Sequence, residues 1–236
     1  MKGMHSMKDL INIRTLAHQF LIKQGIHKLY ITYEELEEIC QNLGYDVRTY
    51  NEAENIIEKL NLQESTKRDS FTYNKNNVML VLIRGDLSYG RKIRVLAHEI
   101  GHIYIGHKSH CGIIGDSSDH AREQQQEDEA NTFAYEIIAT TCVLRKLKIY
   151  STAQITSYTF LNHDDSEEVL HNLKFFKSLP TDTKVLEQYK DFIEEYTPPN
   201  NYLSTGKLIL GLISAFGLGI CVTLLIISLY YRNGGF

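Results

Sequence analysis

The pattern of apolar and polar positions predicts helices in the first part of the chain. Apolar residues recur at helical spacing in Met7–Ile26 and Tyr33–Leu43, and Asn51–Leu60 has a weaker pattern of the same kind. We expect the second of these helices to begin after Thr32 as its N-cap and to end at Gly44. These segments are therefore expected to form a helical layer.

Three short segments have the pattern of β-strands. Tyr45–Tyr50 alternates, Ser70–Tyr73 follows a polar turn, and Asn77–Ile83 is an aliphatic run that ends at the turn-like Arg84-Gly85-Asp86. Strands that are interspersed with helices are typical of an α+β domain. The sequence therefore predicts a small mixed sheet packed on helices.

The next helix is predicted at Arg91–His107 and carries a motif with its own chemistry. Its apolar positions recur at helical spacing, and beside them lie His98, Glu99 and His102, in the pattern HExxH. Residues four apart stand on one face of a helix, so both imidazoles can reach one metal ion. Zinc suits two neutral imidazoles and a third ligand, and Glu99 can then accept a proton from the water that zinc activates. The apolar positions are Ile93, Leu96, Ala97, Ile100 and Ile103.

The third ligand is expected on a second helix, Arg122–Thr141. Glu129 falls on the same side of this helix as Ala130, Phe133 and Ile137, so a carboxylate at position 129 is expected to face inward. Glu136 is its competitor for this role. The remaining acidic residues of the helix, which are expected to be solvated, are Glu123, Glu127 and Asp128.

These two helices resemble the ImmA/IrrE family of metallopeptidases. The resemblance rests on HEIGH at 98–102, on the motif ExEANxFA at 127–134, on the lead-in Arg94-Val95-Leu96-Ala97 and on the trailing Gly106-His107. It extends more loosely from about Leu10 to about Leu179.

The resemblance implies a zincin-like fold, a site and a substrate class. It implies that His98, His102 and Glu129 bind zinc, that Glu99 is the catalytic base, and that the substrate could be a helix-turn-helix repressor of a mobile element or a stress response. The chain departs from the family where the second helix usually ends in a Pro-containing stretch, because it reads Ala139-Thr140-Thr141-Cys142 instead.

A long apolar segment near the C-terminus predicts a transmembrane helix. Leu208–Tyr231 contains 24 residues and no charge, and at about 1.5 Å per residue it can cross a hydrocarbon core of about 30 Å. Lys207 and Arg232 flank it. Small residues at Gly211, Ala215 and Gly219 form a ridge that could pair two such helices into a homodimer.

The rest of the chain suggests how the domain is placed. The N-terminal residues carry charges through their apolar positions, so no signal peptide is expected, and the protein is predicted to be tail-anchored with its catalytic domain in the cytoplasm. The scattered cysteines lack a CxxC pair, which agrees with a reducing compartment. The net charge of -4 gives no reason to expect direct nucleic acid binding.

We divide the sequence into a peptidase domain at 1–179, an amphipathic helix and Pro-containing linker at 180–206, a transmembrane helix at 207–231 and a short tail at 232–236. Within the second part, Thr181–Tyr196 is predicted to be one exposed helix. Its apolar face could pack on the domain or lie on the bilayer, and the sequence leaves both open.

Two functions remain for the chain as a whole. The first is a membrane-anchored zinc metalloendopeptidase that hydrolyses a cytoplasmic protein. The second is a non-catalytic, zinc-dependent sensor or binding module that docks a regulator at the membrane. The presence of Glu99 beside both histidines favours the first, because a structural zinc requires no carboxylate there. Three nearby residues whose roles stay open are His107, His110 and Cys111.

Overall fold

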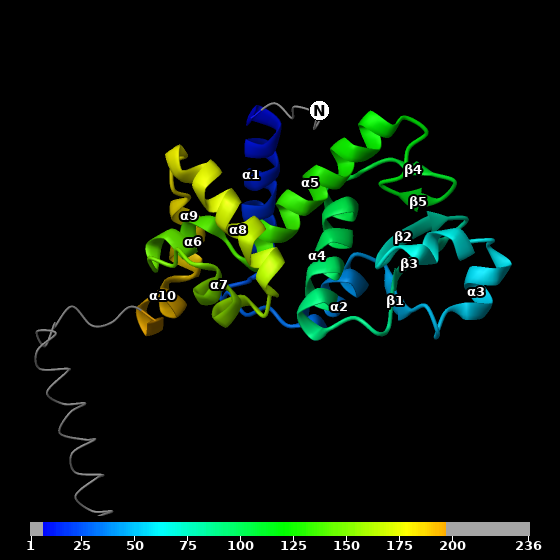
Figure 1. The fold of residues 1–236 in the computed structure, drawn as a ribbon, viewed down its shortest axis with the longest axis horizontal. Helices are drawn as coiled ribbons and strands as arrows, with labels where there is room; N and C mark the ends of the chain where they lie inside the picture. Colours follow the sequence, from blue (N-terminus) through cyan, green and yellow to red (C-terminus); the bar gives the residue numbers. More distant parts are fainter. Residues whose placement is uncertain (1–6, 197–236) are drawn as a thin grey trace, which may run out of the picture. The chain divides into compact units, whose positions relative to one another are not determined.

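A computed structural model describes residues 7–196, which contain helices and a small sheet (Figure 1). The helices in this part are α1 (Met7–Gln24), α2 (Tyr33–Asn42), α3 (Glu54–Lys59), α4 (Tyr89–Ile105), α5 (His120–Ile138), α6 (Thr141–Lys146), α7 (Thr152–Thr159), α8 (His163–Phe175), α9 (Thr183–Gln188) and α10 (Lys190–Tyr196). The strands are β1 (Asp46–Thr49), β2 (Ser70–Lys75), β3 (Val78–Ile83), β4 (Ser109–His110) and β5 (Ile113–Ile114), and short 3-10 turns occupy Gln63–Lys67 and Phe176–Ser178.

The sheet is mixed, with the strand order β1-β3-β2-β5-β4. β1 pairs with β3 in parallel, with Val47 opposite Val81, and the other pairs are antiparallel. A tight turn joins β2 to β3 through Asn76 and Asn77, whose φ angles are 53° and 61°. Such a hairpin turn requires positive φ at both central residues, which asparagine tolerates. For this reason β3 begins at Val78 and not at Asn77, where the sequence predicted its start.

Helices cover both faces of this sheet. Side chains alternate along β3, so Val81 and Ile83 pack into the main core, which includes residues of α4, while Leu80 and Leu82 pack into a smaller cluster with Ile57 of α3. The predicted α+β class with a small mixed sheet is confirmed. A single helical layer is too simple a description, because α3 adds a partial second layer.

The helix α2 begins as the sequence predicted. The Thr32 side chain accepts a hydrogen bond from the Glu35 backbone N–H, and the Glu35 carboxylate accepts one from the Thr32 backbone N–H. This reciprocal pair forms a capping box, which satisfies two backbone donors at the start of the helix.

The helices α4 and α5 lie side by side in the centre of the domain (Figure 1). They approach closely because Gly101 of α4 has no side chain: a Cβ there would lie 3.1 Å from the Ala130 carbonyl oxygen and 3.3 Å from the Phe133 ring. Ile93, Leu96 and other apolar residues of α4 are buried as expected. This contact fixes which turn of α5 stands opposite the HExxH motif.

The segment predicted as one exposed helix is two helices that belong to the domain. The main core receives Val185 from α9, Tyr189 from the junction of the two helices, and Phe192 and Ile193 from α10; Val185 and Tyr189 are fully buried. Of the two placements that the sequence left open, this segment packs on the domain. The domain therefore extends past the boundary at residue 179 that the sequence suggested, as far as Tyr196.

Within residues 7–196, no helix is both long enough and apolar enough to cross a membrane. The transmembrane helix predicted from the sequence at 208–231, with its small-residue ridge, lies outside the described residues.

A buried polar network joins α1, α5 and the start of α9. The carboxylate of Glu136 contacts His18 Nε2 at 3.2 Å and Arg14 Nε at 3.7 Å, and His18 Nδ1 lies 3.1 Å from Asp182. Burial alone would raise the pKa of Glu136, but its hydrogen bonds with His18 and Thr141 and the charge of Arg14 hold that pKa below its ordinary value. Glu136 is therefore an ionised structural residue, which removes it as a competitor for the metal.

Candidate metal centre and active site

The motif helix α4 presents three polar side chains to the inside of the domain. His98, Glu99 and His102 are all buried, at 7, 3 and 2% exposure. The helix ends at Gly106, whose φ of 81° reverses the chain and turns the following His107 back toward the helix. Buried side chains on a rigid helix keep the geometry that a metal site needs.

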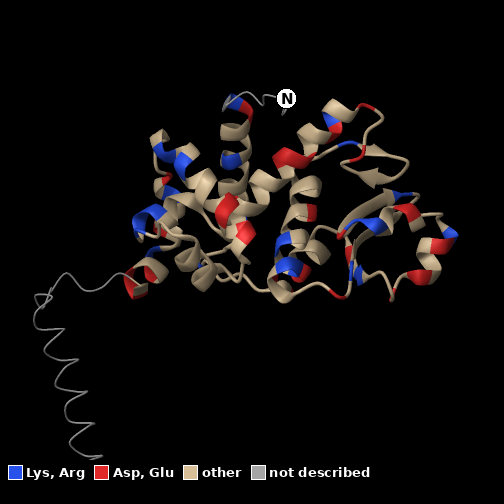
Figure 2. Cartoon of the chain, in the orientation of Figure 1, with Lys and Arg blue, Asp and Glu red and all other residues tan. Residues whose placement is uncertain are grey.

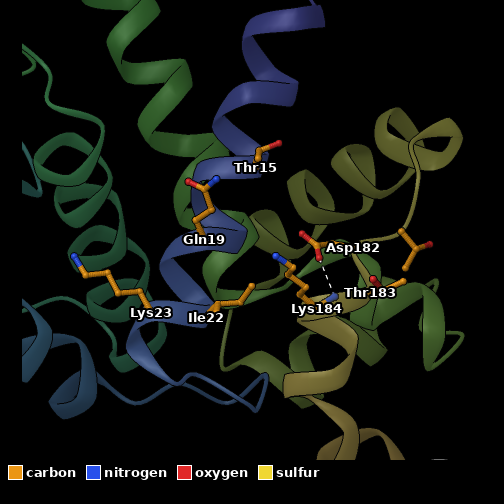
Figure 3. Close-up of a pocket in the computed structure, with 8 residues that line it drawn as sticks. Thr15, Gln19, Ile22, Lys23, Asp182, Thr183 and Lys184 are labelled. Carbon is orange, nitrogen blue, oxygen red and sulfur yellow. Dashed lines mark hydrogen bonds between the residues drawn. The ribbon is translucent and has the colours of Figure 1, made fainter.

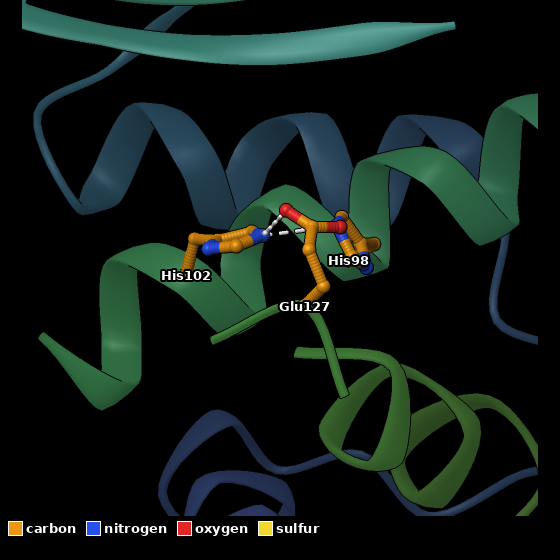
Figure 4. A group of neighbouring side chains, drawn as sticks. All are labelled: His98, His102 and Glu127. Carbon is orange, nitrogen blue, oxygen red and sulfur yellow. Dashed lines mark hydrogen bonds and ion pairs between the residues drawn. The ribbon is translucent and has the colours of Figure 1, made fainter. Parts of the chain in front are cut away.

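The two histidines meet one carboxylate from α5, as Figure 4 shows. His98 Nε2 and His102 Nε2 are 2.9 Å apart, and the carboxylate oxygens of Glu127 lie 3.2 Å and 3.3 Å from them. One ligand atom from each residue lies within 4.8 Å of the others. Two imidazoles and a carboxylate that converge in this way form a donor set suited to zinc.

The sequence selected Glu129 for this place, and the geometry puts Glu127 there. Ala130 contacts Gly101, and Glu127 stands one turn before Ala130 on the same stripe of α5, so its side chain reaches His98 and His102. Glu127 was expected to be solvated. The prediction assumed that the metal lies on the side of α5 that holds Phe133 and Ile137. In the structure the metal-ligand group lies instead in a polar cavity, which the first turns of α5 line through Glu123 and Glu127. Glu129 instead contacts His107 at 3.0 Å.

Glu99 is held by two hydroxyl groups of the neighbouring strand. Ser70 Oγ and Thr72 Oγ1 each donate to one oxygen of its carboxylate, both at 2.7 Å. These two strand residues were missed as site residues by the sequence analysis. The signal was the alternation of β2, which places hydroxyls two residues apart on one face. Both oxygens of Glu99 are thus oriented by the sheet.

The three ligand side chains and Glu99 line one cavity of about 300 Å³. Basic residues on the first turns of α4, blue in Figure 2, also line it, and each has an acidic partner: Arg91 contacts Asp69 at 2.9 Å, and Arg94 lies 3.7 Å from Asp165. The space beside Glu99 is therefore polar and large enough for a water molecule.

A second cavity, of about 550 Å³, lies away from this site, between α1 and the start of α9 (Figure 3). Its lining includes Asp182, whose carboxylate is hydrogen-bonded to His18 Nδ1. It holds no group of side chains comparable with the one around His98 and His102, so we assign the chemistry to the smaller cavity.

The protonation states of the ligand group suit metal binding. Burial lowers the pKa of His98, which favours its neutral imidazole. Burial would raise the pKa of Glu127, but its hydrogen bonds with His102 and His98 hold that pKa well below the ordinary value. Neutral imidazole and ionised carboxylate are the forms that ligate metals.

The other candidates near the motif are now placed. The His107 side chain is only 5% exposed, and its Nδ1 lies 2.8 Å from His102 Nδ1. Burial lowers the pKa of His107 to about 4. His110 and Cys111 are exposed in and beside β4, and neither belongs to the ligand group in the described residues.

Comparison with known proteins finds a family match for the segment that contains this site. Residues 40–152 match the model of the Peptidase_M78 family, described as the IrrE N-terminal-like domain. The matched segment contains α4, the ligand residues and Glu99. It supports the ImmA/IrrE family and a metallopeptidase-like role for this part of the chain. No match was found among curated proteins or among solved structures.

Proposed function

We propose that the protein is a zinc-dependent metalloendopeptidase. The observation that carries this proposal is the buried carboxylate of Glu99 in the same cavity as His98, His102 and Glu127, oriented by two hydroxyls and not consumed as a metal ligand. A zinc ion that only stabilises a fold is usually enclosed by four protein ligands. Here three side chains converge beside a free base, which is the arrangement of a hydrolytic site.

Each residue of the site has a separate role in the proposed reaction. Zinc, when bound by His98, His102 and Glu127, supplies a Lewis acid that polarises a peptide carbonyl and makes water easier to deprotonate. Glu99 accepts the proton of the attacking water and passes it to the leaving amine. Ser70 and Thr72 hold the Glu99 carboxylate in place through both phases.

The substrate proposed for this activity is a cytoplasmic protein. The resemblance to the ImmA/IrrE family favours a helix-turn-helix repressor of a mobile element or a stress response. We further propose that residues 208–231, which contain no charge, anchor the enzyme in the membrane as a single span. The small residues of this span could pair two copies.

The metal prediction tests the site. Full-length protein purified in detergent is expected to carry about one zinc ion per chain, because three convergent ligands form one site. Elemental analysis before and after chelation measures this, and a double variant with His98→Ala and His102→Ala is the control that should carry none. Equal metal content in the wild type and the double variant would contradict the assignment.

The anchoring prediction tests residues 208–231. The full chain is expected to float with membranes in a density gradient after a high-salt wash, because a charge-free segment of this length partitions into the bilayer. A chain ending at Tyr196 keeps the whole described domain and should stay in the soluble fraction. The domain of the full chain should also resist protease added outside intact cells. Equal flotation of both chains, or digestion from outside, would refute the anchor or its orientation.

A further inference from the structure

A chain of hydrogen-bonded side chains connects His102, through His107, to Glu129, the carboxylate that is not part of the metal-ligand group. His102 Nδ1 lies 2.8 Å from His107 Nδ1, and His107 Nε2 lies 3.0 Å from Glu129 Oε2. The other Glu129 oxygen accepts a hydrogen bond from Gln125 at 2.8 Å. The side chains of His107 and Glu129 are 5 and 13% exposed, so water competes little for these contacts.

The proton order along this line follows from the metal position. His102 Nε2 is the atom that faces Glu127 and His98, so a metal would take Nε2 and leave the ring proton on Nδ1. That proton can be donated to His107 Nδ1, which places the His107 proton on Nε2, facing Glu129. An ionised carboxylate only accepts. If His107 instead carried its proton on Nδ1, its Nε2 lone pair would face the Glu129 carboxylate. Both contacts of His107 are therefore satisfied only when His102 is protonated on Nδ1 and has Nε2 free for the metal.

The backbone holds the same ring in position. After the reversal at Gly106, the His107 backbone N–H donates to the His102 carbonyl at 3.1 Å, which brings the two rings together. Gly115 packs on His102: a Cβ there would lie 2.4 Å from the ring Cε1 and 2.5 Å from Nδ1. Gln126 of α5 fixes this loop, since it donates to the Gly115 carbonyl at 2.8 Å and accepts from the Lys108 N–H at 3.0 Å.

The other histidine ligand lacks this support. His98 Nδ1 is buried and makes no hydrogen bond with any residue of the described chain. Of the two histidine ligands, only His102 therefore has a side-chain partner in the described residues that can orient its ring through Nδ1.

We infer that His107 and Glu129 are positioning residues for the metal: Glu129 acts through the His107 imidazole to hold His102 in the tautomer and orientation that bind it. The inference rests on the proposed function. A carboxylate behind a ligating histidine raises the basicity of the ligand, and its removal typically lowers metal affinity about 10- to 100-fold. Here the His107 imidazole stands between the Glu129 carboxylate and His102. Glu129 therefore raises the basicity of His102 through the two hydrogen bonds of His107.

Zinc affinity is the first test. Full-length wild type, Glu129→Gln and His107→Phe are titrated with Zn²⁺ against a chromophoric chelator. Glu129→Gln keeps the size of the side chain and removes the charge, and it should weaken zinc binding about 10- to 100-fold, as should His107→Phe. The matched control is Asp128→Asn, which removes a charge from the same turn of α5, where Asp128 accepts a surface hydrogen bond from Gln124. It should change the affinity by no more than about twofold, as expected for an exposed interaction.

The second test follows the NMR signals of the ring protons of His102 and His107. These signals would not change in Glu129→Gln if Glu129 only stabilised the fold. In zinc-saturated wild type, ¹H–¹⁵N spectra of the histidine rings should show slowly exchanging protons on His102 Nδ1 and His107 Nε2. Both should shift and exchange faster in Glu129→Gln and stay unchanged in Asp128→Asn. Wild-type affinity together with wild-type ring protons in Glu129→Gln would overturn the inference and leave the proposed function standing. Failure of the wild type itself to bind zinc would overturn both.

Discussion

Glu99→Gln is expected to lose peptide hydrolysis while it still binds zinc. Glutamine keeps the length of the side chain but cannot accept the proton of the attacking water, and general base catalysis typically contributes about 10²- to 10⁴-fold to the rate. The ligand set does not include Glu99. The measurement is the rate of cleavage of an unfolded protein substrate, or of the natural substrate in cells, together with zinc content.

Glu123→Gln is the matched control for this change. Glu123 lines the same cavity but pairs with Arg68, at 3.6 Å, and not with a ligand histidine, so its variant should keep most of the activity. Substrate turnover that is normal in Glu99→Gln and lost in His98→Ala would show that zinc maintains a docking surface. The chain would then be the binding module that the sequence also allowed.

Glu127→Ala is expected to abolish stoichiometric zinc binding, with an effect larger than that of any change at Glu129. Glu127 is the carboxylate that faces both His98 and His102, at 3.2 Å and 3.3 Å, whereas Glu129 reaches the site only through His107. Removing one of three protein ligands leaves an incomplete tripod. Zinc titration of Glu127→Ala, Glu129→Ala and Glu123→Ala, the last as control, ranks the three carboxylates. Stoichiometric zinc in Glu127→Ala and its loss in Glu129→Ala would restore the ligand set that the sequence predicted.

The difference between Glu127 and Glu129 shows where sequence reasoning reached its limit. The spacing of His98 and His102 is a property of one helix, and it could be predicted because both ligands share one backbone. The third ligand depends on how two helices pack. That contact is set by Gly101 against Ala130, and a pattern along α5 alone does not reveal which of its turns faces α4.

The same distinction holds for the fold. α1, α2, α4, α5 and β1 were predicted because their residues repeat at helical or strand spacing, and β3 because it is an aliphatic run that ends at a turn. β4 and β5 have two residues each, too few for any period to be visible, and they are held by pairing with each other and with Tyr73 of β2. Ser70 and Thr72 could be placed on one face of a strand, but their bond to Glu99 depends on tertiary packing.

The buried carboxylate of Glu136 bears on where this domain begins and ends as a folding unit. Its helix lies inside the segment 40–152 that matches the family, but both Arg14 and His18 come from α1, and Asp182 comes from the start of α9. A fragment cut at residues 40 and 152 would lose these three partners, together with the helix α1 that packs on α5. In the intact domain, where Glu136 stays buried, removing one of these partners would leave its charge poorly compensated, and such changes typically cost about 3–5 kcal/mol. The candidate site thus depends for its integrity on flanking helices that supply none of the metal-ligand group in the described residues.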